Sequence, residues 1–128
     1  MRKAFFLVVL ALATPLNAAE RPPAMQPRQV ARIDGLIATV SGGILVIHAR
    51  GAVASGGWRA ARLRPLKGGV GDVHTIVVEF IATPPPPSQA VIEGLLPVAA
   101  STTMPIRRGV FSVRSVSGSN EITTQILK

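Results

Sequence analysis

Short β-rich segments separated by turn-forming residues run along most of this chain, and they limit the folds it can adopt. From residue 30 onward, runs rich in Val, Ile, Thr and Phe alternate with clusters of Gly, Pro, Ser and Asn. No window of comparable length shows the 3.6-residue apolar stripe of an amphipathic helix. The pattern therefore predicts an all-β fold, a single antiparallel sandwich of about seven strands, with a small barrel as the alternative. The predicted strands are 30–40, 44–50, 58–64, 73–82, 90–96, 106–116 and 121–127.

The general organisation of this predicted domain, residues 29–128, resembles that of immunoglobulin-like sandwiches. The chain contains no cysteine, so it lacks the inter-sheet cysteine pair of those domains. Without disulfides, the domain must be held together by its own apolar core. A likeness of organisation alone does not indicate a function.

Alternation within two segments predicts which side chains face that core. In 73–82, Ile76, Val78 and Phe80 lie at alternate positions and should share one face. In 121–127, Ile122 and Ile126 share one face, opposite the polar Glu121, Thr123 and Gln125.

The N-terminus has the pattern of a secretory signal peptide. A cationic "MRK" precedes the apolar "AFFLVVLALA", and small residues follow near Ala18 and Ala19. Such a stretch is too short for a transmembrane helix, which needs about 20 apolar residues. We therefore expect residues 1–19 to be removed, residues 20–28 to form an extended Pro-rich leader, and the product to be soluble in the bacterial periplasm or secreted, with no transmembrane segment.

The four prolines at 84–87 allow three interpretations: a linker between domains, a P-x-x-P ligand for a partner, or the exit from a strand. The β-rich stretches on either side are too short for separate domains. Proline lacks the backbone N–H, so we favour the view that the prolines end the preceding strand in a stiff bend.

The charge balance is strongly basic, with 14 Lys and Arg against 6 Asp and Glu, a net charge of +8. Such a charge favours encounters with polyanions. Nucleic acid is disfavoured as the partner because the protein is expected to be exported and has only three aromatic residues beyond the signal. An anionic envelope glycan or a periplasmic protein is the partner that we expect.

The motifs of common enzymes are missing from the sequence. There is no cysteine nucleophile, no G-x-S-x-G elbow and no glycine-rich phosphate motif followed by a helix. We therefore expect a protein that is not an enzyme and has no cofactor.

The sequence does not predict a metal site. His48, Asp72 and His74 could form a three-ligand site if the strands 44–50 and 73–82 were neighbours. The simpler interpretation places His74 at the wet end of the Ile76 face, Asp72 in a turn, and His48 on the solvent side.

One basic segment, "GGWRAARLRPLK", is the candidate ligand-binding site. Strand alternation would place Arg62 and Arg64 on the face of Trp58, and Arg59 on the other face. An aromatic ring beside guanidinium groups suits sugars and anionic ligands. The alternative is that the tryptophan packs into the core and the arginines form a solvated face. The candidate residues are Trp58, Arg59, Arg62, Arg64 and Lys67.

Together these features favour an exported, non-enzymatic β-sandwich that acts as a binding or accessory module in the periplasm. An inhibitor of an exported hydrolase is the alternative. An inhibitor would need a loop that reaches into an active site, and 49–57 and 65–72 are the candidate loops.

Overall fold

The computed structural model describes residues 26–66 and 73–128, which form eight strands and contain no helix. The expected signal peptide, most of the leader, Lys67 and Asp72 lie outside the described residues. The strands are β1 (Arg28–Gln29), β2 (Arg32–Ser41), β3 (Ile44–Ser55), β4 (Arg59–Pro65), β5 (Thr75–Thr83), β6 (Glu93–Pro105), β7 (Ser112–Val116) and β8 (Glu121–Leu127).

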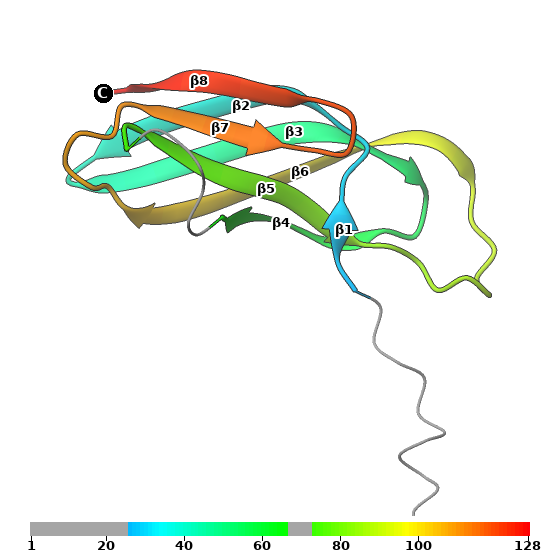
Figure 1. The fold of residues 1–128 in the computed structure, drawn as a ribbon. Coiled ribbons are helices and arrows are strands. Elements are labelled where there is room, and N and C mark those ends of the chain that lie inside the picture. The colour runs from blue at the N-terminus through cyan, green and yellow to red at the C-terminus, as the bar shows by residue number, and fades with distance from the viewer. Residues whose placement is uncertain (1–25, 67–72) are drawn as a thin grey trace, which may run out of the picture.

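The strands form one curled sheet in the order β1-β5-β7-β8-β2-β3-β6, and β4 pairs with β5 (Figure 1). Most pairs are antiparallel, whereas β5–β7 and β2–β8 are parallel. The all-β prediction is confirmed. A separate two-sheet sandwich is not established, because β8 pairs with both β7 and β2 and so joins the two halves. The barrel alternative fits in part, since the sheet curls until β4 lies close to β6.

A single core fills the inside of this curl. Leu45 and Ile47 of β3 face Val78 and Phe80 of β5, and all four are fully buried in one apolar cluster with Val113 of β7. Each half of the sheet therefore covers the apolar side of the other.

The predicted alternation is confirmed in both segments for which it was made. Ile76, Val78 and Phe80 are buried, and Ile122 and Ile126 pack against the core. The range predicted for the last strand is that of β8.

β3 is longer than predicted, because the Gly- and Ala-rich stretch after Arg50 continues the strand rather than forming a loop. Gly51 explains the difference: a Cβ on this residue would lie 2.1 Å from the carbonyl oxygen of Arg32. The glycine allows β2 and β3 to approach closely at the bulge between Ile33 and Gly35. It is therefore a packing glycine within a strand.

A second prediction is wrong. The sequence predicts a strand at 90–96 and a loop after it, whereas β6 runs from Glu93 to Pro105. Pro97 favoured the loop, but proline is compatible with an edge strand when its nitrogen faces away from the neighbouring strand. Ile106 donates its N–H to the carbonyl of Gly43, directly before β3, so even-numbered residues of this stretch bond toward β3. Pro97 therefore sits where no N–H is needed.

Proline and glycine also set the end of β5 and the start of β7. β5 ends at Thr83, directly before Pro84, as expected for the four prolines. β7 begins only at Ser112, not at 106, because Gly109 takes a φ of +87° and Val110 donates its N–H to Arg107 in a turn.

Candidate functional site

Three arginines of the predicted site lie on β4, and its pairing with β5 sets their direction. Arg59 lies opposite Thr83, Arg62 opposite Ile81, and Arg64 opposite Glu79. Residues directly opposite each other on paired strands point to the same side of a sheet. Since Phe80 of β5 points into the core, the odd-numbered β5 residues and their arginine partners point outward.

A β-bulge brings Arg59 to this side, which simple alternation did not predict. The pairing shifts between Arg59 and Arg62, so β4 contains one residue more than the facing part of β5. Ala60, inside the bulge, has a φ of +55°, the left-handed conformation that usually requires glycine. The bulge reverses the alternation, and Arg59, Arg62 and Arg64 form one outer surface, which we call the arginine face.

Trp58 is less exposed than the three arginines. It precedes β4, is half-buried and packs against the apolar core, as Ala61 does. The tryptophan therefore contributes to packing. Lys67, the last predicted residue of the site, lies outside the described residues.

Arg64 is held by Glu79, whose side chain is only 14% exposed. The Arg64 Nη2 lies 2.5 Å from one carboxylate oxygen, and the Gln29 amide donates to the other at 2.8 Å. Burial alone would raise the pKa of Glu79, but the two hydrogen bonds and the charge of Arg64 outweigh it and lower the pKa below its usual value. The carboxylate therefore stays charged and fixes Arg64 against β5.

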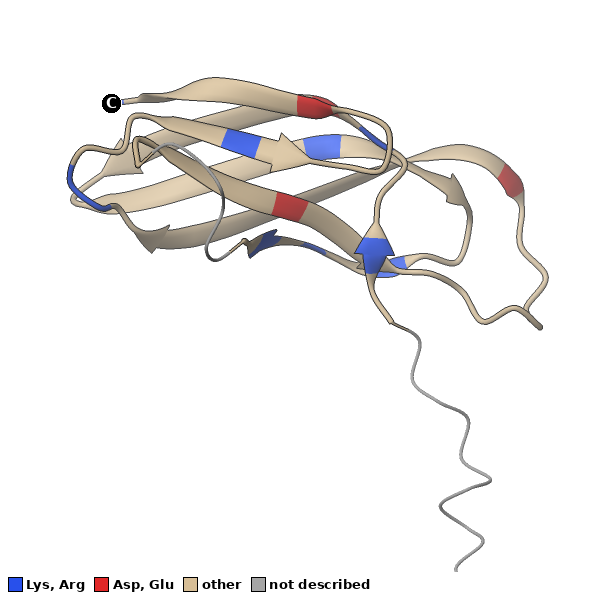
Figure 2. Cartoon of the chain, in the orientation of Figure 1, with Lys and Arg blue, Asp and Glu red and all other residues tan. Residues whose placement is uncertain are grey.

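Arg59 and Arg62 differ from Arg64, because neither has an ion pair within residues 26–66 and 73–128. Both are exposed. Figure 2 shows the basic segments of β4 beside the acidic segment of β5. The arginine face thus offers two guanidinium groups that can bind an external anion.

The condition for the three-ligand metal site is not met, because β3 and β5 are not neighbours in the sheet. His48 is exposed on β3, as predicted. His74 stacks on Phe111 with ring centroids 5.1 Å apart, and its Nδ1 donates to the Gly109 carbonyl at 2.8 Å. Asp72 lies outside the described residues.

The loop candidates for the inhibitor alternative are also changed. Most of 49–57 belongs to β3, where Gly51, Ala52, Val53 and Ser55 are buried. This segment is therefore not a loop that could enter an active site. Most of the other candidate, 65–72, lies outside the described residues.

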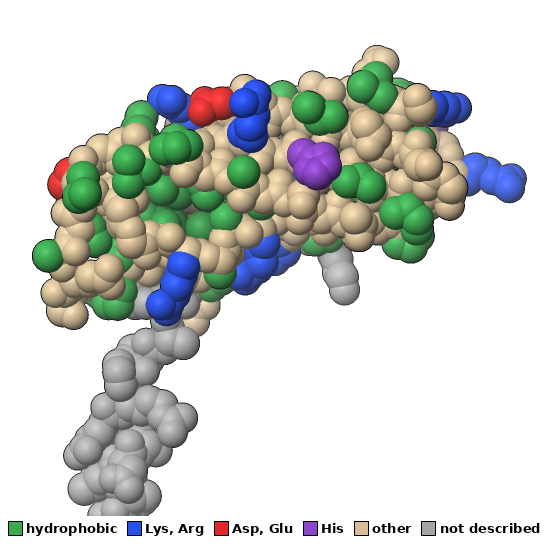
Figure 3. Space-filling model, turned by 180° about the vertical axis from the view of Figure 1, so that it is seen from behind, with side chains coloured by type: hydrophobic (Ala, Val, Ile, Leu, Met, Phe, Trp, Pro, Cys, Tyr) green, Lys and Arg blue, Asp and Glu red, His purple; other side chains and the backbone are tan. Residues whose placement is uncertain are grey.

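Sequence reasoning missed a hollow on the opposite outer face of the sheet, around Arg50. Two adjoining depressions, of about 320 Å³ and 360 Å³, share Arg50 and Ala99 as lining residues. The sequence predicts a loop in 97–105, so it does not place Ala99 beside Arg50. Figure 3 shows this face, where neutral side chains surround a small group of basic and acidic ones.

Comparisons of the chain with protein-family models, curated proteins and solved structures find no match. Within the described ranges, no helix has the length and apolar character needed to span a membrane.

Proposed function

We propose that this protein is an exported, non-enzymatic binding module that acts in the bacterial periplasm and binds an anionic polymer, such as an envelope glycan, through the arginine face. The observation that carries the proposal is the position of Arg59 and Arg62, exposed on one side of β4 without a counter-ion among the described residues.

The spacing of the arginines supports a polymer more than a small ion. Their partners on β5 are Thr83, Ile81 and Glu79, which follow one another at every second residue. At about 3.4 Å per residue, the guanidinium groups start roughly 7 Å apart along one line. A linear ligand with recurring anionic groups can contact two or three of them at once.

Rigidity of the face supports specific binding. Ile81 is fully buried between Gln29 of β1 and Arg62 of β4, and Glu79 anchors Arg64. A guanidinium carried on a paired strand loses less freedom on binding than one on a loop. In this proposal the two halves of the curled sheet serve as the two layers of a sandwich, with the arginine face on the outside of one layer.

The test is a binding measurement with polygalacturonate, a linear anionic glycan, against uncharged dextran. The double variant Arg59→Gln/Arg62→Gln should bind about tenfold more weakly than the parent. Arg107→Gln/Arg108→Gln, which removes the same charge from two exposed residues before β7, should change affinity by no more than about twofold.

Three results would overturn the proposal. They are an equal loss of affinity in both double variants, binding of dextran as tight as that of polygalacturonate, and no binding of polygalacturonate by the parent protein. Capture of one exported hydrolase, with loss of its activity, would instead favour the inhibitor alternative.

A further inference from the structure

The hollow around Arg50 is a candidate for a second binding site, independent of the arginine face. Arg50 lies on β3, directly between Gly35 of β2 and Ala99 of β6. Gly35 has no side chain, and that of Ala99 is a single methyl group. The Arg50 side chain covers Gly35, so a shallow trough is left over Ala99, between β3 and β6. We call it the Arg50 trough.

Larger side chains border the trough along both sides. On β6, Pro97 and Ser101 flank Ala99, and Ser101 lies opposite His48 of β3. The floor contains the backbone of Gly51, which must stay a glycine for the reason given above. Pro97 and Asp34 thus line one side of the trough, and the other side carries a hydroxyl and an imidazole.

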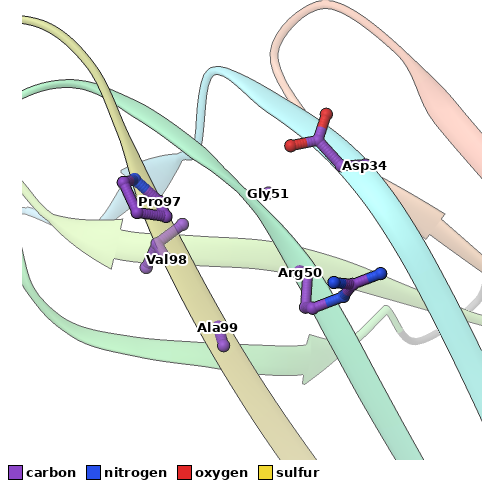
Figure 4. A pocket seen from close by; sticks show the side chains of 6 residues that line it. All are labelled: Asp34, Arg50, Gly51, Pro97, Val98 and Ala99. Carbon is purple, nitrogen blue, oxygen red and sulfur yellow. The ribbon is translucent and has the colours of Figure 1, made fainter.

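The guanidinium of Arg50 lies along one end of this trough. A Cβ on Gly35 would be 3.1 Å from its Nη2 and 3.5 Å from its Nε, so the group rests on the bare backbone of β2. Figure 4 shows the Arg50 side chain directed toward β2, with Pro97, Val98 and Ala99 on the far strand. The space over Ala99 stays open.

Arg50 also has no ion pair within the described part of the chain. The nearby Asp34 lines the same hollow, but its Oδ1 is bound by the Nε of Arg32 at 2.8 Å. The Arg50 guanidinium is therefore available to an external acceptor, and a single guanidinium matches a carboxylate with two parallel hydrogen bonds.

We propose that the Arg50 trough binds a small carboxylate with a short apolar chain. The carboxylate pairs with Arg50, and the chain lies over Ala99 toward Pro97. A volume of about 320 Å³ lies at the lower end of ligand pockets, which span roughly 300–1000 Å³. The small apolar side chains of Pro97 and Ala99 beside a single guanidinium favour such a ligand over a polyanion.

The experiment is an NMR titration of the whole protein with butanoate, hexanoate and octanoate, with the matching primary amides as uncharged controls. Affinity should rise with chain length by at least twofold per methylene, against a limit of roughly fourfold for full burial. Shifts should appear at Arg50, Ala99 and Ser101. The amides should bind at least tenfold more weakly.

Variants on each face separate this site from the arginine face. Arg50→Gln and Ala99→Leu should each weaken octanoate binding at least tenfold, and Arg50→Lys should weaken it several-fold because lysine cannot make the paired hydrogen bonds. Arg62→Gln should change it by less than twofold. Thermal melts verify that each variant is folded.

The proposal fails if octanoate does not bind, if the affinity does not depend on the length of the carboxylate chain, or if Arg50→Gln leaves the affinity for octanoate unchanged. A loss in Arg62→Gln with none in Arg50→Gln would place the anion on the arginine face instead. Loss of polygalacturonate binding has no bearing on the Arg50 trough, so the two proposals can fail separately.

Discussion

The two outer faces of the curled sheet use arginine in opposite ways. On β4, Arg59, Arg62 and Arg64 follow one another along a single strand and form an exposed line of charge. On the other half, Arg50 lies between the small residues Gly35 and Ala99, and the nearby Asp34 is paired with Arg32. A row of exposed arginines suits a long polyanion, whereas a single guanidinium between small residues suits one small anion. The surroundings of an arginine, more than its charge, thus set the ligand that it can bind.

The largest effect should come from Gly51→Ala, beneath the Arg50 trough. Its Cβ would collide with the Arg32 carbonyl, and relieving a backbone clash requires β2 and β3 to separate. We expect the free energy of unfolding to fall by about 3 kcal/mol and the melting temperature to drop by more than about 10 °C.

Gly35→Ala is the matched control on the same face, since its Cβ would meet only the flexible end of Arg50. It should cost no more than about 1 kcal/mol. Equal melting of Gly51→Ala and the parent would show that β2 and β3 are farther apart than described.

Trp58→Ala tests whether the tryptophan belongs to the core or to the arginine face. Because Trp58 is half-buried against the core cluster, we expect a loss of about 2 kcal/mol in chemical denaturation, below the cost of a fully buried tryptophan. Trp58→Phe should recover most of this loss. A variant Trp58→Ala as stable as the parent, with weaker glycan binding, would restore the platform interpretation.

Glu79→Gln tests the support beneath Arg64 and should cost no more than about 1 kcal/mol at pH 7, because Arg64 is half-exposed and solvent screens the pair. The pKa of Glu79 is lowered in the folded protein, so its stabilising effect is present above the unfolded value of 4.5. This effect is lost as the pH falls through the folded-state pKa.

Melting curves of the parent and Glu79→Gln should therefore differ at pH 7 and converge as the pH falls well below 4.5. Gln29→Ala should show a smaller difference of the same sign. A gap between the parent and Glu79→Gln that does not change with pH would contradict the charged state of Glu79.

The smallest expected effect has the opposite sign. Ala60→Gly should stabilise the protein by about 0.5–1 kcal/mol, because glycine adopts a positive φ without the steric cost that alanine has there. Ala61→Gly, one residue further along β4, should destabilise it. If Ala60→Gly also destabilises the protein, the bulge that aligns Arg59 with Arg62 has a different backbone geometry.

The sequence predicted the parts of the fold that depend on alternation. β8 and the buried set Ile76, Val78 and Phe80 follow directly from a two-residue period, because one face of each strand is apolar and the other is not. The end of β5 at Thr83 follows from the missing N–H groups of the prolines.

Features that depend on a neighbouring strand could not be predicted. Gly51 has the composition of a turn, and only the nearby carbonyl of Arg32 shows why it lies in a strand. Pro97 is acceptable in β6 only because that strand lies at the edge of the sheet. The bulge at Ala60, which places Arg59 on the arginine face, is likewise absent from the local pattern. The basic segment was therefore found from its composition, but its geometry was not.

The central claim is that Arg59 and Arg62 bind the polyanion, and the NMR signals of the arginine Nε–H groups test it most directly. Polygalacturonate is titrated at about 0.01 M ionic strength, where the Debye length is about 30 Å, and salt is then added. The account predicts that the signals of Arg59 and Arg62 shift most and return as salt is raised, while those of Arg107 and Arg108 move little. Shifts confined to Arg107 and Arg108, equal shifts at all arginines, or no shift at all would contradict it.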